Sequence, residues 1–117
     1  MKKEDFIEKI KKEIPSTQQE NIEMQSEFIE LFNLFSLPYE KIQEKIYHAI
    51  EQGIMMIQNK NPLAPRYFLI MSELPFIDQK IRDFCIDTML FAEGDMYGEF
   101  KSIDEIFNKF NKIKTRK

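Results

Sequence analysis

The sequence predicts an all-α protein. Its 117 residues contain three glycines, five prolines and no valine. The residue types in excess, Glu, Lys, Ile, Leu, Met and Gln, favour helices over a sheet built on β-branched and turn residues. Apolar residues also recur at helical spacing along most of the chain. Because a chain of this length fits one hydrophobic core, we predict a single domain over residues 1–117, folded as a compact bundle of five or six helices.

The first helix is predicted over residues 3–14. Its apolar side chains recur at helical spacing and mark one inward face: Phe6, Ile7, Ile10 and Ile14. Pro15 ends this helix, because proline lacks the backbone N–H that a helical interior requires.

The second helix is predicted to present two different faces. Ser16 or Thr17, followed three residues later by Gln19 or Glu20, predicts a capping box at its start, and the helix is expected to reach Phe35. One face is apolar: Met24, Phe28, Leu31, Phe32 and Phe35. The other face is acidic: Glu20, Glu23, Glu27 and Glu30. Spacings of three and four residues keep these glutamates on one side of the helix, so they form a stripe.

A third helix is predicted to begin near Pro38, since proline suits the first turn of a helix. Isoleucines one turn apart mark its buried face: Ile42, Ile46, Ile50, Ile54 and Ile57. Gly53 lies within this helix and costs about 1 kcal/mol relative to alanine. We therefore expect either the close approach of another backbone or a bend at Gly53. Residues 59–65, which include two prolines, form the clearest loop.

The second half of the chain predicts three more helices. A short apolar helix runs from Pro65 to Glu73 and stops before Pro75. The next ends near Gly94, where glycine suits the position after the helix, and a loop follows over residues 94–98. Its inward face is Ile77, Ile81, Phe84, Cys85, Thr88 and Met89. Ser102 and Glu105 predict a capping box for the last helix. Its apolar face is Ile103, Ile106, Phe107, Phe110 and Ile113.

The acidic residues are segregated along the chain. No basic residue lies between Lys12 and Lys41, and a second acidic block lies between Arg82 and Lys101, although the net charge is only -3. Fields from like charges add over a patch and steer a complementary partner. We therefore expect residues of both blocks, together with one tyrosine in the loop over residues 94–98, to contact a basic protein: Glu20, Glu23, Glu27, Glu30, Asp83, Asp87, Glu93, Asp95, Tyr97 and Glu99.

These features predict a small cytoplasmic binding protein that neutralises a basic partner. Bacterial immunity proteins, antitoxins and phage inhibitors act in this way on nucleases and other nucleic-acid-binding proteins. The single cysteine allows no internal disulfide, and the N-terminus has no secretory signal. The longest apolar run, residues 67–71, is too short to span a bilayer. The acidic balance argues against direct nucleic-acid binding, and we expect a monomer or a weak dimer.

Residues that carry chemistry are few, so we predict no enzymatic activity, no cofactor and no metal site. His48 is the only histidine, whereas di-iron bundles need two Glu-x-x-His pairs, and we expect a solvated side chain. Cys85 is expected to be buried and unreactive. Asp83 and Asp87 would support acid–base or metal chemistry only if the fold brought Glu93, Asp95 or Glu99 beside them.

The alternative function is a helical adaptor or regulatory subunit. Seven methionines and eleven phenylalanines are enough to supply an apolar docking surface, since flexible thioethers adapt to partner surfaces. Ionic strength separates the two hypotheses, because salt weakens charge-driven binding and leaves apolar docking nearly unchanged.

Overall fold

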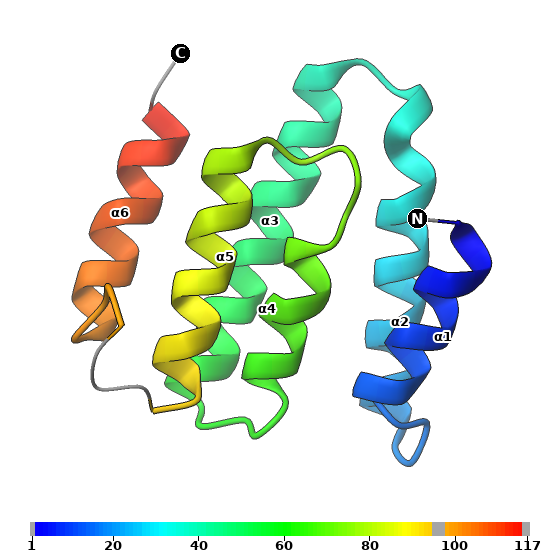
Figure 1. The fold of residues 1–117 in the computed structure, drawn as a ribbon, viewed down its shortest axis with the longest axis horizontal. Helices are drawn as coiled ribbons and strands as arrows, with labels where there is room; N and C mark the ends of the chain where they lie inside the picture. The colour runs from blue at the N-terminus through cyan, green and yellow to red at the C-terminus, as the bar shows by residue number, and fades with distance from the viewer. Residues whose placement is uncertain (1, 95–97, 116–117) are drawn as a thin grey trace.

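The computed structural model describes residues 2–94 and 98–115, and this part of the chain contains six α-helices, one 3-10 turn and no strand (Figure 1). The prediction of an all-α bundle is therefore confirmed. The elements are α1 (Lys3–Glu13), α2 (Gln19–Phe32), η1 (Asn33–Ser36), α3 (Tyr39–Gln58), α4 (Ala64–Ser72), α5 (Gln79–Ala92) and α6 (Ile103–Thr115).

The helices form two groups around one core. Figure 1 shows α3, α4 and α5 at the centre of the molecule, with α6 at one edge and the α1–α2 hairpin at the opposite edge. The short helix α4 packs against α5 and α3, α6 packs against α5 and α3, and α1 packs against both α2 and α4. Helix α1 therefore joins the α1–α2 hairpin to α4, and Phe28 of α2 adds a ring contact with Tyr67 of α4.

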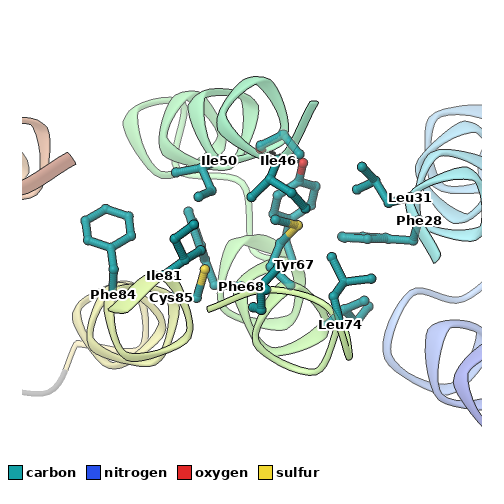
Figure 2. Close-up of a cluster of buried hydrophobic side chains, with 14 of the residues drawn as sticks. Phe28, Leu31, Ile46, Ile50, Tyr67, Phe68, Leu74, Ile81, Phe84 and Cys85 are labelled. Atoms are coloured by element: carbon teal, nitrogen blue, oxygen red, sulfur yellow. Dashed lines mark hydrogen bonds between the residues drawn. The ribbon is translucent and has the colours of Figure 1, made fainter. Parts of the chain in front are cut away.

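The core is built on the isoleucine face of α3. Ile46, Ile50 and Ile54 are at most 1% exposed and belong to the buried core. Figure 2 shows Ile46 and Ile50 facing aromatic and aliphatic side chains of the neighbouring helices. Phe84 of α5 is also buried. The predicted inward faces of α3 and α5 are therefore confirmed, because burial of a periodic apolar face is the main force that holds a helix in a globular fold.

Gly53 marks a close approach between α3 and α4, although not the approach of a backbone. A Cβ atom at this position would lie 2.7 Å from the Cζ atom of Phe68 and 2.8 Å from two ring atoms of Tyr67. The glycine therefore makes room for two aromatic rings of α4, and α3 continues through it as an uninterrupted helix.

The predicted start and end of the second helix were wrong. Helix α2 begins after Gln18 without a side-chain cap, and it ends at Phe32, where the chain tightens into η1. Ser16 does not cap the helix, because it lies two residues before the N-cap Gln18. Its Oγ instead accepts a hydrogen bond from Nε2 of Gln25 at 2.9 Å. Gln25 also donates to the carbonyl of Ile14 at 2.6 Å. A buried amide of α2 thus holds the α1–α2 turn and takes the place of the predicted capping box.

Two other predicted helix ends are confirmed. The backbone N–H of Glu105 donates to Oγ of Ser102 at 3.2 Å, and its carboxylate accepts from the backbone N–H of Lys101 at 2.6 Å. This arrangement is a capping box displaced by one residue on the side of the glutamate. Gly94 has a φ of +87° directly after the C-cap of α5, a conformation that favours glycine.

Candidate functional site

The acidic stripe of α2, formed by Glu20, Glu23, Glu27 and Glu30, faces solvent. All four side chains are exposed, and the opposite face of the helix buries Phe28 and Phe32. In the part of the chain that the structure describes, the ion pairs join Lys9 to Glu73 and Lys114 to Glu51. None of them involves the stripe, so its four negative charges are not neutralised by the fold.

An open groove of about 520 Å³ lies beside this stripe, between α2 and α3. Its floor is apolar and comes from four elements: Phe28 and Leu31 of α2, Leu34 of η1, Ala49 of α3 and Tyr67 of α4. Figure 2 shows Phe28 and Leu31 pointing from α2 toward Tyr67. The groove is therefore lined by the edge of the core and not by a separate cluster.

Tyr67 fixes the floor of the groove. Its ring lies 4.8 Å from that of Phe28, centroid to centroid, at an interplanar angle of 53°. Its hydroxyl donates a hydrogen bond of 2.7 Å to the backbone carbonyl of Ala49. Burial raises the pKa of Tyr67, and the carboxylate of Glu27 adds to this effect, so the phenol stays protonated and remains a donor. The Tyr67 side chain of α4 thus lies between α2 and α3 and contacts both helices.

The two rims of the groove carry different charges. Glu27 and Glu30 of the stripe form the α2 rim. The α3 rim includes two cations and three other polar side chains: Lys41, Lys45, Glu44, His48 and Gln52. No ion pair within the described residues crosses the groove. The groove therefore has an apolar floor, an acidic rim and a predominantly basic rim. The charges of the two rims do not form ion pairs with each other.

His48 is exposed on the groove rim, as expected of a solvated histidine, and its Nε2 lies 3.1 Å from Nε2 of Gln52. Cys85 is fully buried, and burial raises the pKa of its thiol despite the nearby cation of Arg82. A thiol held in its protonated form is a poor nucleophile. Burial therefore holds the Cys85 thiol in its unreactive form.

The second acidic block lies on α5 and the segment after it, and Figure 1 shows α4 between α5 and α2. Asp83, Glu93 and Glu99 are exposed and Asp87 is half-buried. Burial raises the pKa of Asp87, the carboxylates of Glu99 and Asp83 raise it further, and Lys109 opposes them. The charge of Glu99 thus acts on Asp87, and acid–base chemistry at Asp83 and Asp87 required such a carboxylate.

This cluster does not form a metal site in the structure. Across residues 2–94 and 98–115, no three side chains of His, Cys, Asp or Glu converge in a way that could hold a metal ion. Asp95 and Tyr97, which sequence reasoning also assigned to partner contact, lie outside the described residues. None of the helices in the same ranges combines the length and apolar character that crossing a membrane requires.

The apolar residues of the alternative hypothesis are mostly inside. Among the side chains that the structure describes, Met55 is the one methionine that is exposed, at 55%, and no phenylalanine is exposed. The other large exposed apolar residues are spread over several elements: Ile22, Leu37, Tyr39 and Ile86. The groove floor is a concave apolar surface, and sequence reasoning did not identify it.

A weak signal for the groove exists in the sequence. Ala49 is a small residue on the edge of the isoleucine face of α3, next to the polar positions Lys45 and Gln52, and a small side chain there leaves space above it.

Comparison of the chain with protein-family models, with curated proteins and with solved structures finds no match in any of the three. The geometry of the groove and stripe is therefore the basis for the functional argument.

Proposed function

We propose that this protein is a small binding protein that docks a basic protein partner on the acidic stripe of α2 and thereby covers the partner's basic surface. A nuclease or another nucleic-acid-binding protein has the required chemistry, so the expected consequence of docking is inhibition. The observation that carries the proposal is the stripe itself: four exposed glutamates on one helix face, none of them in an ion pair within the described residues.

The spacing of the charges supports this type of partner. Glu20 and Glu30 are separated by about 15 Å at 1.5 Å per helical residue, so the stripe presents one negative charge every few ångströms along a line. One strand of duplex DNA presents a charge about every 3.4 Å. A row of lysine and arginine side chains that binds a phosphate backbone would therefore be attracted to the same surface.

Charge pairing of this kind sets the rate and specificity of association more than the final affinity. Exposed ion pairs contribute only about 0–1 kcal/mol each, so the stripe alone would give weak binding. The apolar floor of the neighbouring groove provides area that can be buried in addition. This feature also favours the second candidate, an adaptor that docks through apolar contacts, but in that case the stripe would have no role.

The test compares two variants of equal net charge. In the stripe-reversed variant, Glu20, Glu23, Glu27 and Glu30 are replaced by lysine. In the control variant, four exposed acidic residues elsewhere are replaced by lysine, none of them in an ion pair within the described residues: Glu4, Asp5, Glu8 and Asp104. Binding of a synthetic lysine-rich peptide is measured by titration calorimetry and by association rate, at about 10 mM and about 150 mM salt, where the Debye length is about 30 Å and about 8 Å.

We expect the stripe-reversed variant to bind the peptide more weakly and more slowly than the control variant at low salt. The difference should shrink at the higher ionic strength, because exposed charges are then screened from one another. Circular dichroism of both variants checks that the fold is retained. Equal binding by the two variants would mean that the stripe is only a solvated helix face, and the adaptor function would then be preferred.

A further inference from the structure

The groove has the length of several helical turns. Its lining residues on α3 run from Lys41 to Gln52, a distance of about 16 Å at 1.5 Å per residue. On α2 and η1 they run from Glu27 to Leu34, or about 10 Å. The groove is open to solvent, so an elongated occupant can lie along it with its side chains in the groove and its backbone outside.

We propose that the groove between α2 and α3 receives one amphipathic helix of the protein partner. This inference rests on the proposed function, since the partner is the same, and it adds the structure of the segment that binds. The apolar face of the helix covers Leu31, Ala49 and Tyr67, its basic flank faces Glu27 and Glu30, and an acidic flank faces Lys41 and Lys45. Docking of an amphipathic helix in an apolar groove is a recurrent mode of recognition, read through anchors at positions i, i+3, i+4 and i+7.

Charge complementarity selects this occupant. The side chains of Lys41 and Lys45 are one turn apart on α3, and those of Glu27 and Glu30 are nearly one turn apart on α2. A helix docked in the groove also presents its flanking side chains about one turn apart. The charged side chains of each rim can therefore lie opposite charged side chains of the docked helix. The two lysines outnumber Glu44 on the α3 rim, so a uniformly basic helix would meet a net like charge there. A uniformly acidic helix would meet like charge at Glu27 and Glu30.

The groove lacks the features of a closed ligand pocket. Its rims carry charges of both signs that no described residue neutralises, so a small apolar ligand would leave them facing each other across it without partners. A helix with one basic and one acidic flank pairs both rims at once. Such pairing also sets the direction in which the helix lies along the groove, because reversal of the helix exchanges its two flanks and places like charges opposite each other.

The probe is a set of synthetic helical peptides with one tryptophan each. The protein has no tryptophan, so the emission reports the peptide alone. Each peptide has about 18 residues, long enough to form a helix, and one apolar stripe that contains the tryptophan. In the two-flank peptide, lysines occupy one side of the stripe and glutamates the other. In the mixed-flank peptide, which has the same composition, both sides carry lysine and glutamate alternately.

We expect the two-flank peptide to bind with a blue-shifted tryptophan emission and with a Kd about ten times lower than that of the mixed-flank peptide, a ratio equivalent to about 1.4 kcal/mol. Equal Kd values for the two peptides would overturn the assignment of the flanks. The double variant Lys41→Glu with Lys45→Glu provides a charge-exchange test. It should bind the two-flank peptide less well and a peptide with lysines on both flanks better than the wild type does.

Filling the groove tests its occupancy. Ala49 is 8% exposed at the groove floor, so Ala49→Phe places a ring in the space that the apolar face of the peptide would fill. Gln58→Phe adds the same ring at the exposed end of α3 and serves as the matched control. We expect Ala49→Phe to abolish the emission shift and Gln58→Phe to leave it unchanged.

The outcomes separate this inference from the proposed function. Equal binding of the two-flank peptide to Ala49→Phe and Gln58→Phe would overturn the groove inference, while the lysine-rich peptide would still report on the stripe. Sedimentation of the protein alone provides a second check. A dimer that dissociates in Ala49→Phe and persists in Gln58→Phe would mean that a second copy fills the groove, and this result would also overturn the inference.

Discussion

The rings of Phe28 in α2 and Tyr67 in α4 lie with their centroids 4.8 Å apart at an interplanar angle of 53°. This contact joins the α1–α2 hairpin to the rest of the bundle, in addition to the packing of α1 against α4. The Tyr67 hydroxyl then reaches α3, where it donates to the carbonyl of Ala49. A single aromatic side chain thus joins three helices. Because it is rigid and fills the space between α2 and α3, it also determines how far apart the two rims of the groove stand.

Removal of the Tyr67 hydroxyl tests this connection. We expect Tyr67→Phe to lower the free energy of unfolding by about 0.5–1.5 kcal/mol, because the ring contact with Phe28 is retained while the buried hydrogen bond to Ala49 is lost. Urea unfolding gives the value. Tyr39→Phe is the control, since Tyr39 is 52% exposed and its hydroxyl lies 3.3 Å from Asp78. Equal losses in the two variants would contradict the role of Tyr67.

Sequence reasoning succeeded where the signal is local and periodic. The isoleucines of α3 and the apolar face of α5 follow the helical period closely, and burial of such a face leaves few alternatives. The same is true of the last helix cap, where Ser102 and Glu105 are three residues apart. The acidic stripe is equally local, since its exposure follows once Phe28 is placed inside.

The groove and the α1–α2 turn could not be predicted because they depend on residues far apart in the sequence. Ser16 has the features of a helix cap, but Gln25, which has no cap signature, competes for its hydroxyl. The groove depends on contacts of Tyr67 with Ala49 and Phe28, which precede it in the chain by 18 and 39 residues. Neither the spacing of apolar residues in α4 nor the turn residues beside it predict that Tyr67 lies between α2 and α3.

The close approach at Gly53 gives a second prediction. Alanine is favoured over glycine in a helix by about 1 kcal/mol, but the added Cβ would lie 2.7 Å from Phe68. We expect the overlap to exceed the gain in helix propensity, so that Gly53→Ala lowers the free energy of unfolding by about 1–3 kcal/mol. Thermal and urea unfolding of the variant provide the measurement.

A second substitution separates the overlap from other effects of Gly53→Ala. Phe68→Leu shortens the side chain that the new methyl group meets, and the cost of Gly53→Ala should be smaller in that background than in the wild type. Such non-additivity is expected for residues in direct contact. An increase in stability of about 1 kcal/mol for Gly53→Ala would mean that helix propensity alone determines this position.

Asp87 gives a prediction on pH. Burial, helped by the carboxylates of Glu99 and Asp83, raises its pKa in the folded protein. The folded state therefore binds the proton more tightly than the unfolded state, and ionisation of Asp87 lowers the stability as pH rises through the raised pKa. We expect Asp87→Asn to be more stable than the wild type at pH 7 and to lose this advantage below the unfolded-state pKa near 3.8.

Lys109 provides the matched control for Asp87, because its positive charge opposes the rise of the Asp87 pKa. Lys109→Gln should therefore lower the stability at pH 7, and this loss should be absent in the Asp87→Asn background. The double-mutant cycle is measured by urea unfolding at several pH values. A gain from Asp87→Asn that is the same at every pH would show that the effect comes from packing and not from charge.

The final prediction concerns Arg82, whose guanidinium holds the C-terminal end of α4. Its Nε donates to the carbonyl of Ser72 at 2.9 Å and its Nη2 to the carbonyl of Leu74 at 2.8 Å. Lysine has a single nitrogen and lacks this fork, so Arg82→Lys should lose one of the two bonds and about 1.5–3 kcal/mol of stability. Lys80→Arg, at an exposed position of the same helix, should change the stability little.

The backbone amides in the last turn of α4 should also exchange their hydrogens faster in Arg82→Lys, because local opening there becomes easier. Unchanged exchange together with unchanged stability would mean that water satisfies these carbonyls equally well.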